Sequence, residues 1–330
     1  MINTAHPETA FALDAARAAA RVARKVQREM QVEGVQKADA SPVTVGDFAL
    51  QAIVAQKLAQ AFPEDLLIAE ENAGILREEA NAELLQMITH FVRSEIPTAT
   101  PESVCDWIDL GTAKSGQRFW TLDPIDGTKG YLRGGNYAAA LALVVDGVVQ
   151  LGVLACPKLP LDCSPRDDGE GMLAIARRGE GAWRGRLEDG ADAFEQMHAS
   201  PCADPSQVRL LRSYESAHTN TSQVDGLAAA LGTSADPVRM DSQAKYAVLA
   251  AGFGEVLVRF LSPDKPDYKE KIWDQAAGTI VLEEAGGRIT DLYGNALDFS
   301  HGRKLERNRG VLATNGKLHD QVLEAMKEVL

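Results

Sequence analysis

Residues 123–128, which read Asp-Pro-Ile-Asp-Gly-Thr, constrain the fold of this chain more than any other stretch. They follow a run of apolar and β-branched residues, 119–122, that predicts a strand. The proline fixes one backbone angle and removes a hydrogen-bond donor, whereas the glycine permits a tight turn. The strand is therefore expected to end in a turn that carries two carboxylates three residues apart.

Two carboxylates held this close repel each other unless a cation lies between them. Hard divalent cations such as Mg²⁺ prefer oxygen ligands of this kind and commonly bridge to a substrate phosphate. The alternative is a strand-ending turn whose Asp side chains only cap the backbone. A capping turn needs one Asp, so the pair Asp123 and Asp126 favours a metal site.

Acidic residues also stand at the ends of other predicted elements. Glu70 and Glu71 follow the apolar run 66–69, Asp274 opens an apolar helix, and Asp47 precedes another helix. A solvated rim, a helix cap or a partner of the helix dipole would explain any one of them. Four strand or helix ends that each present an acid are better explained by one shared site.

Three motifs together resemble the inositol monophosphatase family of Mg²⁺-dependent, lithium-sensitive phosphatases. They are residues 123–128, the Glu-Glu pair at 70–71, and Trp-Asp-Gln-Ala-Ala-Gly at 273–278. The longer stretches 123–134, 241–246 and 268–274 resemble one branch of that family, the 3'(2'),5'-bisphosphate nucleotidases. The resemblance runs from about Phe11 to the C-terminal helix and so covers nearly the whole chain.

The resemblance implies which residues hold metal ions. Glu70, Asp123 and the backbone carbonyl of Ile125 would hold a first Mg²⁺ ion. Asp123, Asp126 and Asp274 would hold a second, and a weaker third ion would lie near Glu70. This sequence departs from the family pattern at none of these positions, so two or three Mg²⁺ ions per site are expected.

The resemblance also implies the catalytic and substrate-binding residues. Asp47 would orient the hydroxyl of Thr128, which in turn would position the attacking water. The nucleotide would be contacted by Gly127, Thr128, His218, Ser242, Lys245, Arg259 and Tyr268. A single Lys or Arg such as Lys245 or Arg259 could also be an ordinary surface cation, but both lie near or within the branch-like motifs. A second, retained phosphate needs fixed cations of this kind.

Water is the expected nucleophile on chemical grounds alone. The six His residues form no metal pair at helical spacing, and no Cys lies in a Cys-x₅-Arg phosphate loop. Bulk water, with a pKa of about 15.7, becomes a usable nucleophile at neutral pH beside a divalent cation. Asp47 and Thr128 would orient the water and take up its proton, a contribution of about 10²–10⁴-fold. The displacement would be in line, without a phosphoenzyme.

Charge and composition exclude several classes of partner. The net charge is −13 and there is no basic run, so binding to nucleic acid or to an anionic membrane is not expected. No apolar run approaches the length of a membrane span. Cys105, Cys156, Cys163 and Cys202 lack Cys-x-x-Cys pairing, and no signal peptide is apparent, so reduced thiols and a cytoplasmic location are expected.

The chain is expected to be an α/β protein with an α+β N-terminal half. Helices are predicted from Glu8 to about Met30, from about Leu50 to Phe62, and over residues 78–91, with a loop around Pro97 and Pro101. Apolar strands over residues 138–145 and 148–156 join at Asp-Gly, a strong hairpin signal. Another hairpin follows, and then strands and helices alternate.

The loop 157–171, rich in Pro, Asp and Gly, predicts a boundary between two subdomains, 1–156 and 157–330. The first would carry most metal ligands, and the second the nucleotide contacts and Asp274. By resemblance the whole would be a layered α/β/α/β/α sandwich. A site built from both halves must lie where they meet.

Three functions follow from this reasoning. The leading one is an Mg²⁺-dependent phosphatase that converts adenosine 3',5'-bisphosphate to AMP and phosphate, and that also accepts 3'-phosphoadenosine 5'-phosphosulfate. An inositol or sugar phosphate phosphatase is the alternative. A non-enzymatic binding protein is the third, although it would not need the water-activating pair Asp47 and Thr128. The sequence leaves open a monomer or a homodimer.

Overall fold

The computed structural model describes residues 2–30, 35–36, 42–43, 45–214 and 221–330. Within these residues, seven strands form the first sheet, in chain order from one edge to the other. They are β3 (Leu66–Ala69), β4 (Arg118–Asp126), β5 (Ala138–Val145), β6 (Val148–Cys156), β7 (Met172–Arg177), β8 (Ala182–Arg186) and β9 (Glu195–Gln196). β3 runs parallel to β4, and every later neighbour is antiparallel.

The Asp-Gly hairpin signal is confirmed. β5 and β6 pair directly, and the two residues between them, Asp146 and Gly147, have φ angles of 51° and 74°. Two successive left-handed residues give the turn that matches the twist of the flanking strands. The second predicted hairpin is formed by β7 and β8.

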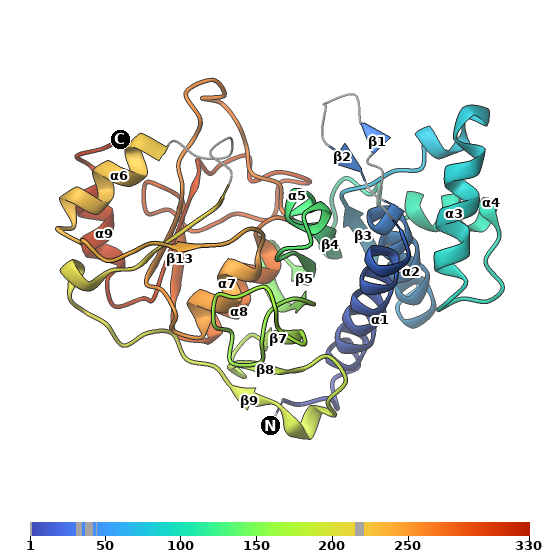
Figure 1. Cartoon of the computed structure of the whole chain (residues 1–330), viewed down its shortest axis with the longest axis horizontal. Helices are drawn as coiled ribbons and strands as arrows, with labels where there is room; N and C mark the ends of the chain where they lie inside the picture. Colours follow the sequence, from blue (N-terminus) through green and yellow to red (C-terminus); the bar gives the residue numbers. More distant parts are fainter. Residues whose placement is uncertain (1, 31–34, 37–41, 44, 215–220) are drawn as a thin grey trace.

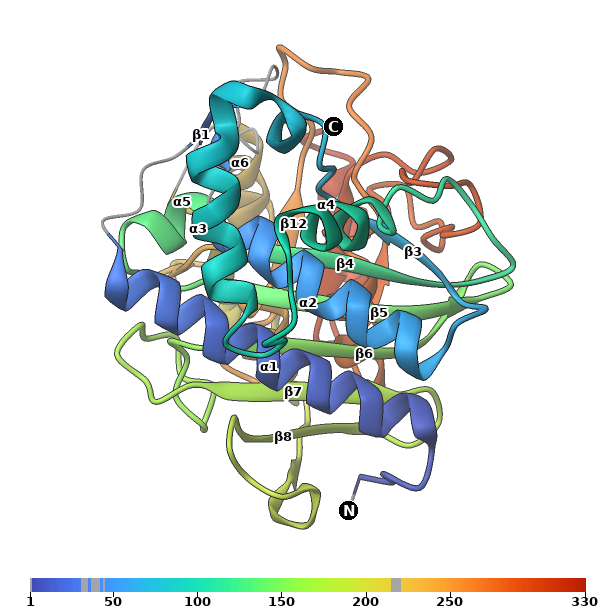
Figure 2. The same ribbon diagram turned by 90° about the vertical axis from the view of Figure 1, so that its right-hand side faces the viewer.

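Two long helices, α1 (Pro7–Glu29) and α2 (Val45–Ala61), cover one face of the first sheet, and Figure 2 shows them lying across its strands. α1 begins with a proline, which loses nothing in a first turn whose N–H groups have no helical partner. Its apolar face is buried against the sheet, from Phe11 to Val26. α3 (Ala82–Val92) and α4 (Pro101–Asp109) pack against α2 from outside.

The other face of the first sheet is covered by α7 (Ala244–Ala250) and α8 (Ala276–Glu284). α8 approaches β6 closely at Gly152, where a Cβ atom would lie 2.4 Å from the Cγ2 atom of Ile280. A larger residue at this position would separate the helix from the sheet. Buried side chains of α7 and α8 also pack against the second sheet.

The second sheet consists, in the described part of the chain, of five strands in the order β11-β10-β12-β14-β13. Their bounds are β10 (Leu210–Arg212), β11 (Val238–Arg239), β12 (Val256–Arg259), β13 (Arg288–Thr290) and β14 (Val311–Thr314). α6 (Thr221–Ala230) and α9 (His319–Met326) cover its outer face. The layers therefore run α/β/α/β/α, as expected from the resemblance, and Figure 1 shows α7 and α8 between the two sheets.

Short elements complete the described chain. They are β1 (Val35–Gln36), β2 (Pro42–Val43), α5 (Thr128–Leu132) and four 3₁₀ turns, Ile75–Arg77, Glu79–Asn81, Ala191–Ala193 and Pro205–Gln207. The four cysteines, all within the described residues, are unpaired. No helix in the described part of the chain combines the length and apolar character needed to cross a membrane.

Several predictions about elements differ from the structure. The helix expected from about Leu50 begins at Val45, so Asp47 lies inside its first turn, and the helix expected from residue 78 begins at Ala82, after a 3₁₀ turn. The loop expected around Pro101 is wrong, because Pro101 begins α4 and Thr100 caps it through a reciprocal hydrogen-bond pair with Ser103. The first sheet also continues past the predicted boundary, since β6 and β7 on either side of loop 157–171 pair with each other. The division between the two sheets falls between residues 196 and 210.

Candidate active site

The turn after β4 is shaped by its sequence in the way the motif predicted. The pairing of β4 with β5 shifts register between Asp123 and Asp126, so the strand end is irregular where the two acids lie. Gly127 has φ 86°, and a Cβ atom on it would lie 2.7 Å from the Cβ atom of Ser242. Glycine is therefore required both for the left-handed backbone and for the contact with the segment that precedes α7. Thr128 then begins α5.

Acids from four separate segments converge on this turn. Asp123 is only 2% exposed, and its Oδ1 atom has no hydrogen-bond partner among the described atoms. Burial raises the pKa of Asp123 well above its usual range, and the charges of Glu70, Asp126, Asp274 and Asp47 raise it further. We call these five residues the acidic cluster.

Two other members of the cluster are also disfavoured as anions. Burial raises the pKa of Asp126, although the charges of Lys245 and Arg259 and the backbone N–H of Gln243, which donates to Asp126, oppose that rise. Burial raises the pKa of Asp274 as well, against the opposing charge of Arg259. The described cations thus offset only part of the negative charge.

The residues of the acidic cluster fit hard divalent cations. All are carboxylates, the type of ligand that Mg²⁺ prefers, and Asp123 presents a buried oxygen without a partner. Among the described residues, no group of three or more His, Cys, Asp or Glu side chains could hold a metal ion as the side chains stand. The ligand set of Glu70, Asp123, Ile125, Asp126 and Asp274 therefore stays a prediction about side chains that close around an ion.

The predicted catalytic pair lies at the same place. Asp47 is buried in the first turn of α2, and its charge acts on Asp123. The Thr128 hydroxyl donates a hydrogen bond to the Ile125 carbonyl oxygen at 3.2 Å. Orientation of Thr128 by Asp47 stays a prediction, because the described hydrogen bond of that hydroxyl goes to Ile125.

Lys245 lies in α7, and Ser242 precedes that helix and packs against Gly127. Lys245 is 7% exposed, and its Nζ atom donates to Ser213 Oγ at 2.9 Å and to the Met240 carbonyl oxygen at 3.4 Å. Burial lowers the pKa of Lys245 to about 8, although the charge of Asp126 opposes that shift. Ser242 has φ 68°, a left-handed conformation that is uncommon for a residue with a Cβ atom.

Arg259 and Tyr268 are the remaining predicted substrate-binding residues that the structure describes. Arg259 forms an ion pair with Glu270 at 3.0 Å. The pKa of Arg259 is raised overall, because the negative charges of groups such as Glu270 and Asp274 outweigh the opposing effect of burial. Tyr268 is partly exposed, and burial together with the charges of Glu270 and Asp274 raises its pKa. The structure thus brings Lys245, Arg259 and Tyr268 together with the acidic cluster. His218 lies outside the described residues.

Several polar residues that support the site were not among those predicted. Glu270 accepts hydrogen bonds from Arg259 and from Gln275 Nε2, and Gln275 in turn accepts one from the Tyr246 hydroxyl. Glu270 lies inside the branch-like motif 268–274, so its position was available, but nothing local to the sequence indicated its partners. Gln51 and Arg303 hydrogen-bond to the backbone of Glu71 and Ala69, the residues on either side of Glu70, and no motif of the sequence indicated either side chain.

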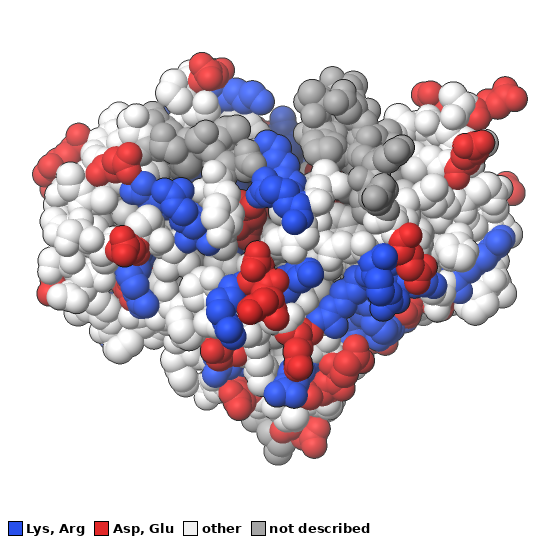
Figure 3. Space-filling model, viewed as in Figure 1, with Lys and Arg blue, Asp and Glu red and all other residues white. Residues whose placement is uncertain are grey.

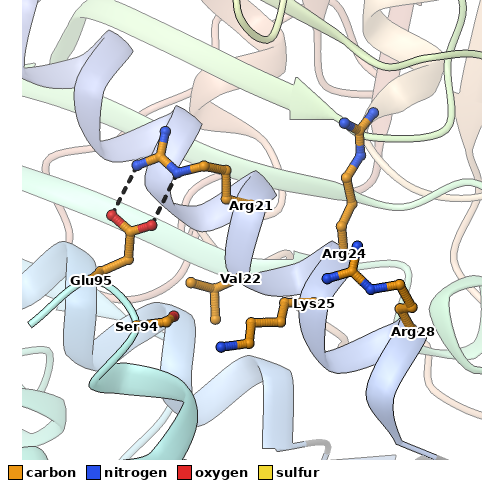
Figure 4. A pocket seen from close by; sticks show the side chains of 7 residues that line it. All are labelled: Arg21, Val22, Arg24, Lys25, Arg28, Ser94 and Glu95. Atoms are coloured by element: carbon orange, nitrogen blue, oxygen red, sulfur yellow. Dashed lines mark hydrogen bonds and ion pairs between the residues drawn. The ribbon is translucent and has the colours of Figure 1, made fainter.

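A separate cavity of about 340 Å³ lies between α1 and the segment after α3. Figure 3 shows basic side chains gathered over the region of α1. Figure 4 shows Arg21 bound by both carboxylate oxygens of Glu95, whereas Arg24 and Arg28 extend away from that pair. Arg24 donates to the carbonyl oxygens of Pro157 and Glu170. None of the residues that line this cavity belongs to the acidic cluster.

Comparison with known proteins gives a consistent result. The sequence profile of the inositol monophosphatase family matches residues 5–330. A 3'(2'),5'-bisphosphate nucleotidase of Oryza sativa is 42% identical over 342 residues, covering 98% of this chain and 94% of that protein. A 3'(2'),5'-bisphosphate nucleotidase of Emericella nidulans is 39% identical over 320 residues, covering 90% of each. The IMPase of Thermotoga maritima shares the fold, with a TM-score of 0.68 at 21% identity over 98% of this chain and 97% of its own.

Proposed function

This chain belongs to the inositol monophosphatase family, and we propose that it is a 3'(2'),5'-bisphosphate nucleotidase. Its substrate would be adenosine 3',5'-bisphosphate, which it would convert to AMP and phosphate, and 3'-phosphoadenosine 5'-phosphosulfate would be accepted as well. The observation that carries the proposal is the acidic cluster: Asp123 is buried with an unpartnered oxygen and with four further acids acting on it.

Asp47 and Asp123 are buried, and Glu70, Asp126 and Asp274 beside them are partly exposed. Five carboxylates gathered around a buried position are unfavourable unless positive charge compensates them. Lys245 and Arg259 oppose the rise in the pKa of Asp126, yet that pKa is still raised. Glu70, Asp123, Asp126, Asp274 and the Ile125 carbonyl would therefore hold Mg²⁺. When bound, Mg²⁺ would lower the pKa of water and stabilise the charge that develops on the transferred phosphoryl group.

The chain's own residues would orient the attack. Because the Thr128 hydroxyl donates its hydrogen bond to the Ile125 carbonyl oxygen, the lone pairs of the hydroxyl oxygen can accept a hydrogen bond from the attacking water. Asp47, buried in the first turn of α2, would take up the proton that the water loses. No side chain is needed as a covalent phosphate carrier, so the displacement is direct.

The preference for a nucleotide that carries two phosphates rests on the cations beside the cluster. Lys245 and Arg259 are held in place by Ser213 and Glu270, so they are pre-organised for an anion. An arginine offers a planar fork and a lysine a point charge, and both suit a phosphate that is bound without being cleaved. Inositol or sugar monophosphates would leave part of this positive charge unused.

The test is a phosphate-release panel in the presence of Mg²⁺. We expect kcat/KM for adenosine 3',5'-bisphosphate to exceed that for inositol 1-phosphate by at least about tenfold, since hydrogen bonds to charged groups contribute about 1.5–3 kcal/mol each. Asp123→Asn should lose most of the activity, whereas Asp168→Asn, a change at an exposed acid, should not. A preference for inositol 1-phosphate would instead support the inositol phosphatase alternative.

A further inference from the structure

The backbone around Glu70 is held from both sides by side chains that belong to distant segments. The preceding residue, Ala69, donates its N–H to the Gly111 carbonyl oxygen at 2.9 Å and accepts a hydrogen bond from Arg303 at its own carbonyl. The following residue, Glu71, donates its N–H to Gln51 Oε1 at 2.9 Å and accepts from Gln51 Nε2 at 2.8 Å. The backbone on both sides of Glu70 is therefore held by hydrogen bonds to the side chains of Arg303 and Gln51.

Gln51 connects this segment to the helix that carries Asp47. It is fully buried and lies four residues after Asp47 on α2, so the two side chains share a face of the helix. Besides its two bonds to Glu71, its Nε2 atom donates to the Ile108 carbonyl oxygen at 2.8 Å. A Cβ atom on Gly111 would lie 2.6 Å from that nitrogen, so a glycine there leaves room for the amide.

Arg303 connects the same segment to the part of the chain that carries Asp274. Its guanidinium donates to the carbonyl oxygens of Ala69 and Gly111, the latter at 3.1 Å. The guanidinium carbon lies 4.7 Å from the ring centroid of Trp273, the residue directly before Asp274. A single side chain thus contacts the neighbours of two acids that are more than 200 residues apart in the sequence.

We infer that Gln51 and Arg303 are positioning residues that fix Glu70 relative to Asp47 and Asp274. The inference rests on the proposed function, because it concerns the residues that would hold Mg²⁺. A glutamate side chain has three rotatable bonds, so its carboxylate can be placed reproducibly only if the backbone that carries it is fixed. Displacements of about 1 Å in such sites reduce rates by about 10²-fold.

The test measures Mn²⁺ binding to the full-length protein without substrate, by electron paramagnetic resonance. Partners that orient metal ligands typically change metal affinity by about 10–100-fold, so Gln51→Met and Arg303→Met should each weaken Mn²⁺ binding by at least about tenfold. Arg303→Lys keeps the positive charge but loses the planar, two-pronged guanidinium, so its Mn²⁺ affinity should lie between those of Arg303→Met and the native protein. The Mg²⁺ concentration for half-maximal phosphate release should rise in parallel.

Asn315 provides the matched control. Its Nδ2 atom donates to the carbonyl oxygens of Ser200 and Cys202, and its Oδ1 atom accepts from the Leu318 N–H, the same pattern of bonds that Gln51 makes. Asn315→Leu should lower the unfolding temperature as much as Gln51→Met does, yet leave Mn²⁺ affinity close to that of the native protein. If Gln51→Met does not fold, Gln51→Glu retains the shape and still removes the donations to the Glu71 and Ile108 carbonyls.

The outcomes separate this inference from the proposed function. If the native protein binds Mn²⁺ and hydrolyses the nucleotide, but the Gln51 and Arg303 variants bind Mn²⁺ equally well, the positioning role is wrong and the function stands. If all destabilised variants, Asn315→Leu included, lose Mn²⁺ affinity equally, the effect is a general loss of stability and the positioning role is again wrong. A native protein that binds no Mn²⁺ would overturn both.

Discussion

At the scale of single residues, the site is marked by ionisable side chains whose pKa values are shifted by burial. Asp123 carries a buried oxygen with no partner, and burial is the largest contribution to its raised pKa. Lys245 shows the converse effect, because burial removes water from an ammonium group and lowers its pKa to about 8. Lys245 and Asp126 act on each other through their charges, and perturbed groups of opposite sign in one place are typical of a functional site.

The lowered pKa of Lys245 predicts a pH dependence of substrate capture. Lys245 is cationic below a pH of about 8 and loses its charge above it, so kcat/KM for adenosine 3',5'-bisphosphate should fall as the pH rises through about 8. Lys245→Arg, which keeps its charge across this range, should not show this fall. Initial rates at limiting substrate, measured across the pH range for both proteins, check the prediction. Identical pH profiles would show that the titration of Lys245 does not control substrate capture.

At the level of helices and strands, turn and cap residues predict the bounds of an element where they determine the backbone angles. The Asp-Gly pair between β5 and β6 predicted the turn that joins them, because few sequences tolerate two successive left-handed residues, and the apolar runs on either side predicted the extent of both strands. Pro101 is the exception, since proline favours loops but is equally suited to the first turn of a helix, which is where it lies in α4. The deciding feature was the Thr100 cap with its partner Ser103 three residues later.

His319 joins α9 to the second sheet and predicts a pH-dependent stability. Its ring nitrogens lie 3.0 Å from the hydroxyls of Thr290 and Thr314, and burial lowers its pKa to about 4. An unfolded histidine titrates near 6.5, so the unfolded state takes up the proton first as the pH falls. The stability contributed by the neutral ring is therefore present above about pH 6.5 and is lost as the pH falls towards 4. The free energy of unfolding should decrease by no more than about 1.4 kcal/mol per pH unit in this range.

Urea denaturation at a series of pH values measures this contribution. In His319→Gln the decrease of the unfolding free energy between about pH 6.5 and 4 should be smaller than in the native protein. His90→Gln, a change at an exposed histidine of α3, should retain the native pH dependence. The interpretation of His319 is wrong if His319→Gln loses stability towards acid as steeply as the native protein.

At the scale of the whole molecule, the acidic cluster lies where the layers meet. Asp47, Glu70, Asp123 and Asp126 come from α2 and the first sheet, and Asp274 comes from the segment before α8. The sequence was sufficient to predict these acids, because each stands at or near the end of an element. It could not indicate Gln51 or Arg303, whose partners are backbone groups brought near only by long-range packing. Strand pairing across a loop is likewise not visible in the local sequence. The Pro- and Gly-rich loop 157–171 therefore suggested a boundary, although β6 and β7 on either side of it pair in one sheet.

We propose that acids from both sides of this junction hold divalent cations together. Calorimetric titration with Mn²⁺ in the absence of substrate tests it most directly, with the native protein, Asp274→Asn and the exposed-site control Asp168→Asn compared. We expect at least two Mn²⁺ ions per chain for the native protein and the control, and the loss of at least one when Asp274 is changed. Unchanged Mn²⁺ stoichiometry and affinity in Asp274→Asn would contradict it.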